Sequence, residues 1–506
     1  MTSAKQDYAK VLEISRKARV LGGISSLLGW DQETYMPPKA STIRGEQLKT
    51  LAGIIHEEQT GKSFKNALAK LIDLKTGKVK AKGLSQPQHA SLREWRRDFL
   101  RETALPVKFV EEFAQLVSQS LEVWRHARKE NSFQQFAPFL EKIVTMSRRK
   151  ADLLGYQDHP YDALLDLFEP DITTKDVSQL FGSLRKSITP LLKKITSSKQ
   201  NDDSILHGKF PEDKQIEFSK IILKDMGFDM EGGRLDLSTH PFSSSCHPSD
   251  TRITTRIHPT SVLSNVMTTM HECGHSLYDT AIPAEHYGSP LGEPISHGIH
   301  ESQSRWWETR IGLSKPFWQY YLPILKKTFK GKLDNVSLDA FYRAINFVKP
   351  SFIRVEADEV TYPLHVVLRF EIEKGLIEGS IKVREIPEAW NSKMVELLGI
   401  KPKNNAEGCL QDVHWSMGAF GYFPSYALGN LYASHLFTAF EEEFPEWKKR
   451  VAKGDLTFIR HWLSEAVHQH GRRYSSKELL KKVTGKAFSA DAYVSYLNNK
   501  YAEIYH

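Results

Sequence analysis

Two histidines and a glutamate occur together in one apolar segment, as His271-Glu272-Cys273-Gly274-His275. Histidines four residues apart lie one turn apart on the same face of a helix, so both imidazoles can reach one Zn²⁺ at about 2.0–2.1 Å. Glu272 lies about 100° further round such a helix, where its carboxylate can contact a metal-bound water without displacing it. A general base needs that position, so the segment predicts a metal-dependent hydrolytic site.

A catalytic zinc site has three protein ligands and one open position. Downstream of the two histidines, the nearest further candidates are Glu293, His300 and Glu301. Glu301 belongs to HESQSRWWETR, a proline-free stretch of helix formers, so a second helix can present its carboxylate to the metal. Glu293 lies between Gly292 and Pro294, in a loop context that holds a ligand less rigidly. The residues therefore favour Glu301 and leave the other two open.

Asp279 has two interpretations. It follows His275 by four residues on the same helical face, so its carboxylate can accept the second N–H of that ligand and fix its tautomer. The alternative is an ordinary solvated position on the helix surface.

The predicted site needs a rigid helix, and residues 261–279 have the pattern of one. Apolar residues recur there at steps of three and four, and Thr260 or Ser261 is expected to cap the first turn. Five other segments show the same periodicity: 7–30, 108–128, 178–196, 319–329 and 457–470.

Strand-like alternation is scarce in this chain. Residues 251–258 are the best candidate strand, residues 233–240 are a weaker one, and residues 74–87 have the composition of an exposed loop. We therefore expect a mainly α fold, with one large helical body and a small β-sheet, as a single domain over residues 1–506.

Composition and charge exclude several classes of protein. The 506 residues carry 69 Lys+Arg against 61 Asp+Glu, and 40% hydrophobic with 26% charged residues is ordinary for a globular chain. No apolar run approaches the roughly 18 residues of a membrane span, and the first residues do not resemble a secretory signal. The lysines between 62 and 82 fit a solvated helix face better than a nucleic-acid patch. We therefore expect neither a membrane nor a nucleic-acid partner. Three cysteines without a CxxC pair favour a cytoplasmic setting.

Several separated motifs accompany the metal-binding segment in a fixed order. They are WDQETYMPP at 30–38, HPF at 240–242, DTRIT at 250–254, HECGH at 271–275, HESQ at 300–303, IRVEAD at 353–358 and GCLQDVHW at 408–415. In these motifs the chain resembles the carboxypeptidase Taq family of zinc metallocarboxypeptidases, over nearly its whole length.

The resemblance implies roles that spacing alone does not assign. It makes Glu301 the third ligand, and it implies a long central active-site groove, with the N-terminal helices as one wall, and a homodimer. A carboxypeptidase must bind a free α-carboxylate, for which the family-matched arginines are Arg252 and Arg354. A structural ion pair with Asp250 or Asp358 is the alternative for each of them.

The same resemblance supplies candidate hydrogen-bond donors. His240 and His414 are candidates to donate to substrate carbonyls or to the developing oxyanion. Tyr422 and Tyr426 are candidate phenol donors, with an aromatic core stripe as the alternative.

The sequence thus predicts a metallocarboxypeptidase that removes C-terminal residues from peptides with broad tolerance, disfavouring proline. One divalent cation per chain, Zn²⁺ or alternatively Co²⁺, is expected on His271, His275 and Glu301, with Glu272 as the base. The alternative within the same class is a zinc endo-oligopeptidase acting in the same groove. An inactive peptide-binding scaffold is opposed by the presence of Glu272 and all three ligands.

Overall fold

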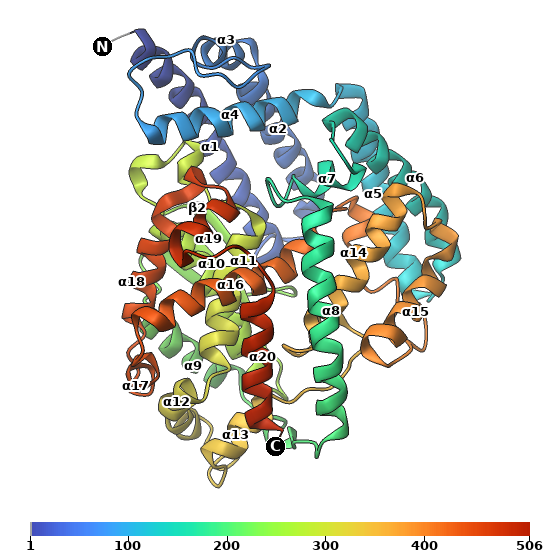
Figure 1. Ribbon diagram of the computed structural model, residues 1–506, viewed down its shortest axis with the longest axis vertical. Coiled ribbons are helices and arrows are strands. Elements are labelled where there is room, and N and C mark those ends of the chain that lie inside the picture. The colour runs from blue at the N-terminus through green and yellow to red at the C-terminus, as the bar shows by residue number, and fades with distance from the viewer. Residues whose placement is uncertain (1–2, 506) are drawn as a thin grey trace.

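The computed structural model describes residues 3–505, and most of them are helical (Figure 1). The N-terminal half contains α1 (Ser3–Thr34), α2 (Ser41–Thr60), α3 (Lys62–Leu71), α4 (Gln86–Ala104), α5 (Val107–Lys129), α6 (Phe133–Leu154), α7 (Pro160–Leu165), α8 (Thr174–Ser197) and α9 (Glu212–Met226). The C-terminal half contains α10 (Val262–Ala281), α11 (His297–Arg305), α12 (Lys315–Thr328), α13 (Leu338–Ile345), α14 (Tyr362–Glu378), α15 (Ile386–Leu398), α16 (Phe423–Glu443), α17 (Trp447–Val451), α18 (Thr457–Ala466), α19 (Ser476–Thr484) and α20 (Asp491–Ile504). The predicted fold class is confirmed.

The helices predicted from periodicity are all present. Helices α1, α5, α8, α10 and α12 lie on the predicted segments within a few residues. Helix α18 ends at Ala466, four residues before the predicted end, and the short turn η9 (His468–Arg473) follows it. Gly471 in that turn has φ +48°, a conformation that interrupts a right-handed helix. Residues 72–85 form the expected connection, because α3 ends at Leu71 and α4 begins at Gln86.

A three-stranded sheet contains both predicted strands and one that the sequence did not reveal. Strand β3 (Asp250–Thr255) lies in the centre, with β1 (Gly233–Leu237) parallel on one side and β2 (Ser243–His247) antiparallel on the other. Strand β2 has the sequence SSSCH, which lacks the β-branched and aromatic residues typical of strands. It forms through antiparallel backbone pairing with β3, from Ser243 opposite Ile253 to His247 opposite Asp250, and its own residue types do not predict it.

The two faces of β3 have different neighbours. Thr251 and Thr255 face α10, where the Ser276 hydroxyl donates to Thr251 Oγ1 at 2.7 Å and the Thr255 hydroxyl donates to Asn265 Oδ1 at 2.7 Å. Because side chains alternate along a strand, Arg252 points to the opposite face, which α1 covers. The sheet therefore supports the metal-binding helix from one side only.

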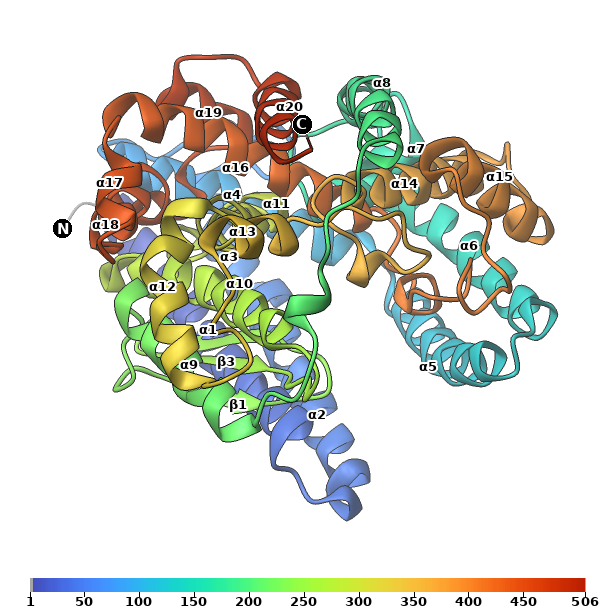
Figure 2. The ribbon, with the colours of Figure 1, turned by 90° about the horizontal axis from the view of Figure 1, so that it is seen from below.

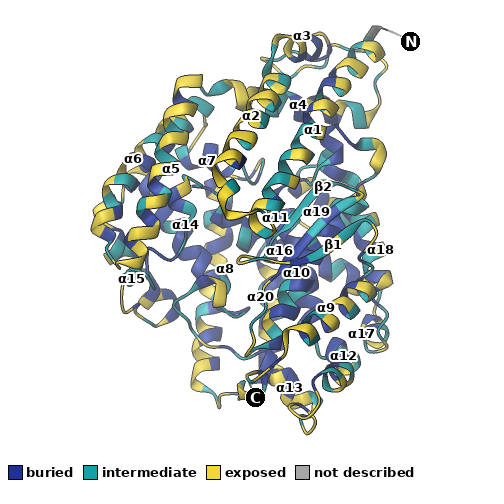
Figure 3. Ribbon diagram, turned by 180° about the vertical axis from the view of Figure 1, so that it is seen from behind, coloured by how far each residue is buried: buried dark blue, intermediate teal, exposed yellow. Residues whose placement is uncertain are grey.

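The helices gather on two sides of the molecule. Figure 2 shows α5, α6 and α15 on one side and α1, α2, α9 and the sheet on the other, with α11, α14 and α16 between them. The main hydrophobic core runs through α10, α11, α14 and α16, and Figure 3 colours α10 and α14 as largely buried. A second, smaller core joins α1, α3 and α4. Over residues 3–505, no helix is long and apolar enough to cross a membrane.

Candidate metal and catalytic site

Helix α10 carries the two histidines on one face. The rings of His271 and His275 lie 5.0 Å apart between centroids, and Glu272 between them is 7% exposed. The helix begins at Val262 after Ser261, which is the N-cap residue, but the Ser261 side chain makes no capping hydrogen bond. The expected side-chain cap is therefore wrong, whereas the predicted start of the helix is right.

Gly274 allows α11 to lie directly against α10. A Cβ at this position would lie 2.7 Å from the Gln303 carbonyl oxygen and from Ser304 Cα, so only glycine permits the contact. The close approach places Glu301 of α11 beside both histidines. Its Oε2 lies 3.7 Å from His271 Nε2 and 3.6 Å from His275 Nε2.

The geometry of these three residues fits a divalent cation. One ligand atom from each of His271, His275 and Glu301 lies within 4.8 Å of the other two. Ligand atoms held about 2.0–2.1 Å from a tetrahedral cation are about 3.4 Å apart, close to the two nitrogen–oxygen distances above. Two imidazoles and one carboxylate are also the donor set that zinc uses in many hydrolases. The other two candidate ligands have different partners: His300 bonds Asp279, and Glu293 pairs with Arg472.

Glu308 orients the first histidine. His271 Nδ1 lies 2.9 Å from Glu308 Oε2, and because a carboxylate only accepts, Nδ1 donates, so that in the neutral imidazole Nε2 is the nitrogen that can bind a cation. Arg305 donates to the same carboxylate at 2.6 Å and to Asn430 Oδ1 at 2.9 Å. Sequence reasoning missed Glu308 and Arg305, although Glu308 follows Glu301 by seven residues, two helical turns.

Of the two interpretations of Asp279, the hydrogen bond to His275 is not the arrangement present. Asp279 Oδ1 lies 3.1 Å from His300 Nε2 instead, and the His300 ring stacks on His275 at 4.3 Å. The Nδ1 atom of His275 has no hydrogen-bond partner among residues 3–505. Asp279 therefore bonds to the imidazole stacked on the ligand rather than to the ligand itself.

Burial changes the acidity of the groups around this site. Burial raises the pKa of Glu272 to about 7, a value suited to a general base, and a cation beside it would lower that pKa again. Burial alone would lower the pKa of His271, but the carboxylates of Glu301 and Glu308 raise it to about 9. Burial lowers the pKa of His275 to about 4. The site therefore concentrates negative charge around His271, which favours a cation there.

Helix α16 brings the predicted phenols beside α11. Gly429 is the contact point, since a Cβ there would lie 2.5 Å from Glu301 Cγ. Tyr426 and Tyr422 lie one and two turns earlier on the same face of the chain, with their rings 5.2 Å apart. His414 Nε2 lies 3.3 Å from the Tyr426 hydroxyl. The structure thus brings His414, Tyr422 and Tyr426 together, next to the proposed third ligand, Glu301.

Arg354 lies beside this group, and its carboxylate partner is Asp412. Its Nε and Nη2 donate to Asp412 Oδ1 at 3.1 and 3.0 Å, and its guanidinium lies 4.8 Å from the centre of the Tyr426 ring. Arg369, fully buried, bonds the other oxygen of Asp412. Asp358 accepts backbone N–H groups of its own turn, so the ion pair with Asp358 that was the alternative for Arg354 is not the arrangement present. Two arginines share one carboxylate, which leaves one positive charge uncompensated.

Arg252 and His240 lie outside the group. Arg252 donates to both oxygens of Asp250, at 2.8 and 3.1 Å, and stacks on Trp30 at 4.4 Å. His240 is exposed in the connection between β1 and β2. Over residues 3–505, neither side chain is within hydrogen-bond distance of the three candidate ligands. The structural ion pair considered for Arg252 is the arrangement present.

A buried carboxylate holds the first turn of α11. Glu169 is fully buried and accepts the Gly298 N–H at 2.9 Å, the Tyr432 hydroxyl at 2.9 Å and the Ser476 hydroxyl at 2.8 Å. A Cβ at Gly298 would lie 2.4 Å from Glu169 Oε2. Glu301 is on the next turn of the same helix, so Glu169 contributes to its position. Nothing in the sequence around Glu169 indicates this role.

A family model described as Carboxypeptidase Taq (M32) metallopeptidase matches residues 10–501. The chain belongs to this family. Carboxypeptidase 1 of Bacillus subtilis is 39% identical to it over 481 residues, 95% of each chain. Thermostable carboxypeptidase 1 of Thermus thermophilus is 38% identical over 508 residues, covering 98% of this chain and 99% of the relative.

Solved structures agree with this assignment. The M32 carboxypeptidase of Deinococcus radiodurans R1 superposes with a TM-score of 0.95 at 35% identity and covers 99% of both chains. The predicted membership of the carboxypeptidase Taq family is confirmed, and the protein is a metallocarboxypeptidase, a peptide hydrolase. An endo-oligopeptidase is not favoured, and membership of a metallopeptidase family implies a divalent metal.

Proposed function

We propose that this metallocarboxypeptidase binds one Zn²⁺ per chain through His271, His275 and Glu301 and cleaves the last peptide bond of its substrate. The observation that carries the proposal is the convergence of the three ligand atoms within 4.8 Å. When bound, the cation supplies Lewis acidity, which acidifies water and polarises a carbonyl. The same nitrogen and oxygen ligands also suit Co²⁺.

Glu272 is the proposed general base. It follows His271 directly on α10 and is 7% exposed, and a bound cation would lower the pKa that burial raises, which leaves the carboxylate ionised and able to accept a proton. Such a group accepts a proton from an attacking water and delivers it to the leaving amine. Glu308 supports this step indirectly, because it fixes the tautomer of His271.

Arg354 is the proposed binding group for the α-carboxylate of the substrate. Arg354 and Arg369 share Asp412, so an incoming carboxylate would balance the remaining positive charge. Arg369 is fully buried, whereas Arg354 borders Tyr426 and donates to the Tyr362 hydroxyl at 3.3 Å. We favour Arg354 over Arg252 because Arg354 lies beside Tyr426 and shares its carboxylate partner with Arg369, whereas Arg252 lies outside this group and its charge is matched by Asp250.

His414, Tyr422 and Tyr426 are the proposed donors to the developing oxyanion. They lie together on the α16 side of Glu301, and one well-placed donor is typically worth about 2.7–4 kcal/mol in the transition state. His240 stays a weaker proposal as a substrate-binding residue, since it is exposed.

One substrate pair tests the recognition of the free terminus. A peptide and its C-terminal amide are compared as substrates, with cleavage products identified by mass spectrometry. We expect the amide to lose most of its rate, because it cannot balance the charge on Arg354. Equal rates on both peptides, with internal cuts, would show an endopeptidase.

A substitution tests the base separately. Glu272→Gln is expected to abolish turnover while metal content, measured by elemental analysis, stays at one ion per chain. Loss of the metal in this variant would show that Glu272 has a different role.

Three broader properties complete the proposal. We infer a single domain over residues 1–506 with the helices at the N-terminus forming one wall of a long substrate groove. The family resemblance also supports a homodimer, and the three cysteines without a CxxC pair favour a cytoplasmic location. Broad tolerance of C-terminal side chains, with proline disfavoured, follows from the same resemblance, and digestion of a mixed peptide library tests it.

A further inference from the structure

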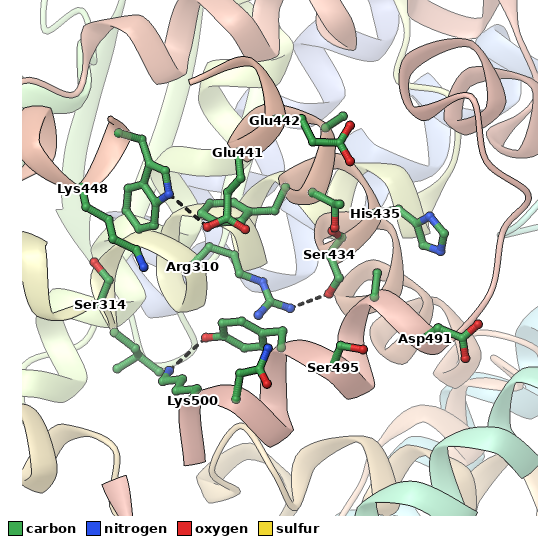
Figure 4. A pocket seen from close by; sticks show the side chains of 18 of the residues that line it. Arg310, Ser314, Ser434, His435, Glu441, Glu442, Lys448, Asp491, Ser495 and Lys500 are labelled. Carbon is green, nitrogen blue, oxygen red and sulfur yellow. Dashed lines mark hydrogen bonds between the residues drawn. The ribbon is translucent and has the colours of Figure 1, made fainter. Parts of the chain in front are cut away.

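A cavity of about 920 Å³ lies away from the metal ligands, among the C-terminal helices (Figure 4). Its walls come from the wide helical turn η5 (Trp306–Gly312), the start of α12, the end of α16, α17 and α20. This volume is in the range of small-molecule sites. The segment η5 also carries Glu308, so the cavity lies behind the residue that orients His271.

Arg310 is the unusual residue of this cavity. It is only 3% exposed, and its Nη2 donates to the Ser434 hydroxyl, whereas its Nε and Nη1 have no hydrogen-bond partner among residues 3–505. The guanidinium lies 3.2 Å from the centre of the Tyr496 ring. Figure 4 shows it reaching between Ser434 and Lys500. A buried guanidinium normally forms several hydrogen bonds, so these unused donors are costly.

The nearest carboxylate does not compensate Arg310. Glu359 Oε1 is 3.9 Å from Nη1, beyond hydrogen-bond distance. Its other oxygen accepts from Lys500 at 2.7 Å and from the Tyr501 hydroxyl at 3.3 Å. Two buried cations therefore share one carboxylate at the inner end of the cavity. Buried charges are normally paired, and the missing partner is one anion.

The outer part of the cavity carries charges of both signs. Glu441, Glu442 and Asp491 line it and are exposed, as are Lys448 and Lys486. Lys486 pairs with Glu442 at 3.0 Å, whereas Glu441 and Asp491 form no ion pair among residues 3–505. Phe437 and Trp447 provide apolar wall. Figure 4 shows Glu441 and Glu442 above Arg310, and Asp491 to one side. A ligand that fits has a carboxylate for the inner end, an ammonium group for the carboxylates of Glu441 and Asp491 and an apolar body between them.

We propose that this cavity is a second ligand site, separate from the metal site, that binds a free α-amino acid with an apolar side chain. The carboxylate accepts from Arg310, whose guanidinium geometry suits that group, and is near Lys500. The ammonium group faces Glu441 and Asp491, which form no ion pair among residues 3–505. A carboxypeptidase releases such molecules, so the ligand is one that the enzyme itself produces.

Calorimetry on the metal-loaded enzyme with L-phenylalanine as the probe tests this site. We expect two binding events per chain, one at the catalytic site and one at this cavity. L-Phenylalaninamide, which lacks the carboxylate, is expected to lose the cavity event, and N-acetyl-L-phenylalanine to bind there at least tenfold more weakly. A cavity event that inorganic phosphate reproduces at equal affinity would mean a general oxyanion site and overturn the assignment.

Two variants assign the event to the cavity. Arg310→Met removes the guanidinium, and Ser495→Trp fills the cavity from α20 without changing any charge. Both are expected to abolish one of the two events, and Ser495→Trp leaves peptide hydrolysis at its normal rate. Asn498→Trp, on the same helix but outside the cavity lining, is the matched control and keeps both events. Two unchanged events in Ser495→Trp would overturn the proposal even if Arg310→Met fails to fold.

Discussion

Glu373 on α14 offers a test of how burial changes the pKa of a carboxyl group that contacts the segment carrying His414 and Tyr422. It is fully buried and accepts from the Tyr161 hydroxyl at 2.6 Å, from Trp415 Nε1 at 2.9 Å and from the Gly421 N–H at 3.0 Å. Two of these donors are next to proposed oxyanion donors in the chain, since Trp415 follows His414 and Gly421 precedes Tyr422. Burial, which outweighs these three donors, raises the pKa of Glu373 from 4.5 to about 7.

The raised pKa of Glu373 sets the sign and the size of the effect of pH on the free energy of unfolding. The native carboxyl binds its proton more tightly than the unfolded one, so its contribution to stability is complete below pH 4.5 and declines as the pH rises to about 7. At about 1.4 kcal/mol per pH unit, the decline amounts to about 3 kcal/mol. Glu373→Gln does not titrate and lacks this decline.

Denaturant unfolding of both proteins between pH 4 and 8 measures the effect. We expect the stability of the wild type, relative to Glu373→Gln, to fall by about 3 kcal/mol over that range. Glu378→Gln on the same helix is the control with the opposite slope, because hydrogen bonds from His159 and Ser380 overcome burial and lower the pKa of Glu378. Parallel pH profiles for the wild type and Glu373→Gln would refute the reasoning.

Three further outcomes are expected. Glu308→Ala removes the acceptor of His271 and should weaken zinc binding 10- to 100-fold in a chelator competition, and an unchanged affinity would contradict its orienting role. Gly298→Ala places a Cβ against Glu169 and should cost about 1–3 kcal/mol of stability and reduce kcat, whereas Gly182→Ala, which has open space around it, should not destabilise the protein. Removal of the metal with a chelator should abolish hydrolysis until zinc is restored, and activity that survives complete removal would contradict a metal-dependent reaction.

Much of the site was predictable from the sequence because its signals are local. The four-residue spacing of His271 and His275 places both on one helical face in any fold, and Glu272 follows from the same geometry. The apolar periodicity of α1, α5, α8 and α10 is likewise a property of neighbouring residues, and it located these helices within a few positions. Residue types alone favoured Glu301 but left Glu293 and His300 open, and the family resemblance chose among them.

Only the tertiary structure decided which side chains pair. Asp279 bonds His300 instead of His275, Arg354 bonds Asp412 instead of Asp358, and strand β2 forms because β3 lies beside it. The partners of Asp279 and Arg354 lie 21 and 58 residues away in the chain, so their choice depends on how the helices pack. Helical periodicity records which face of a segment is buried, but hydrogen bonds and ion pairs act over a few ångströms and depend on that packing.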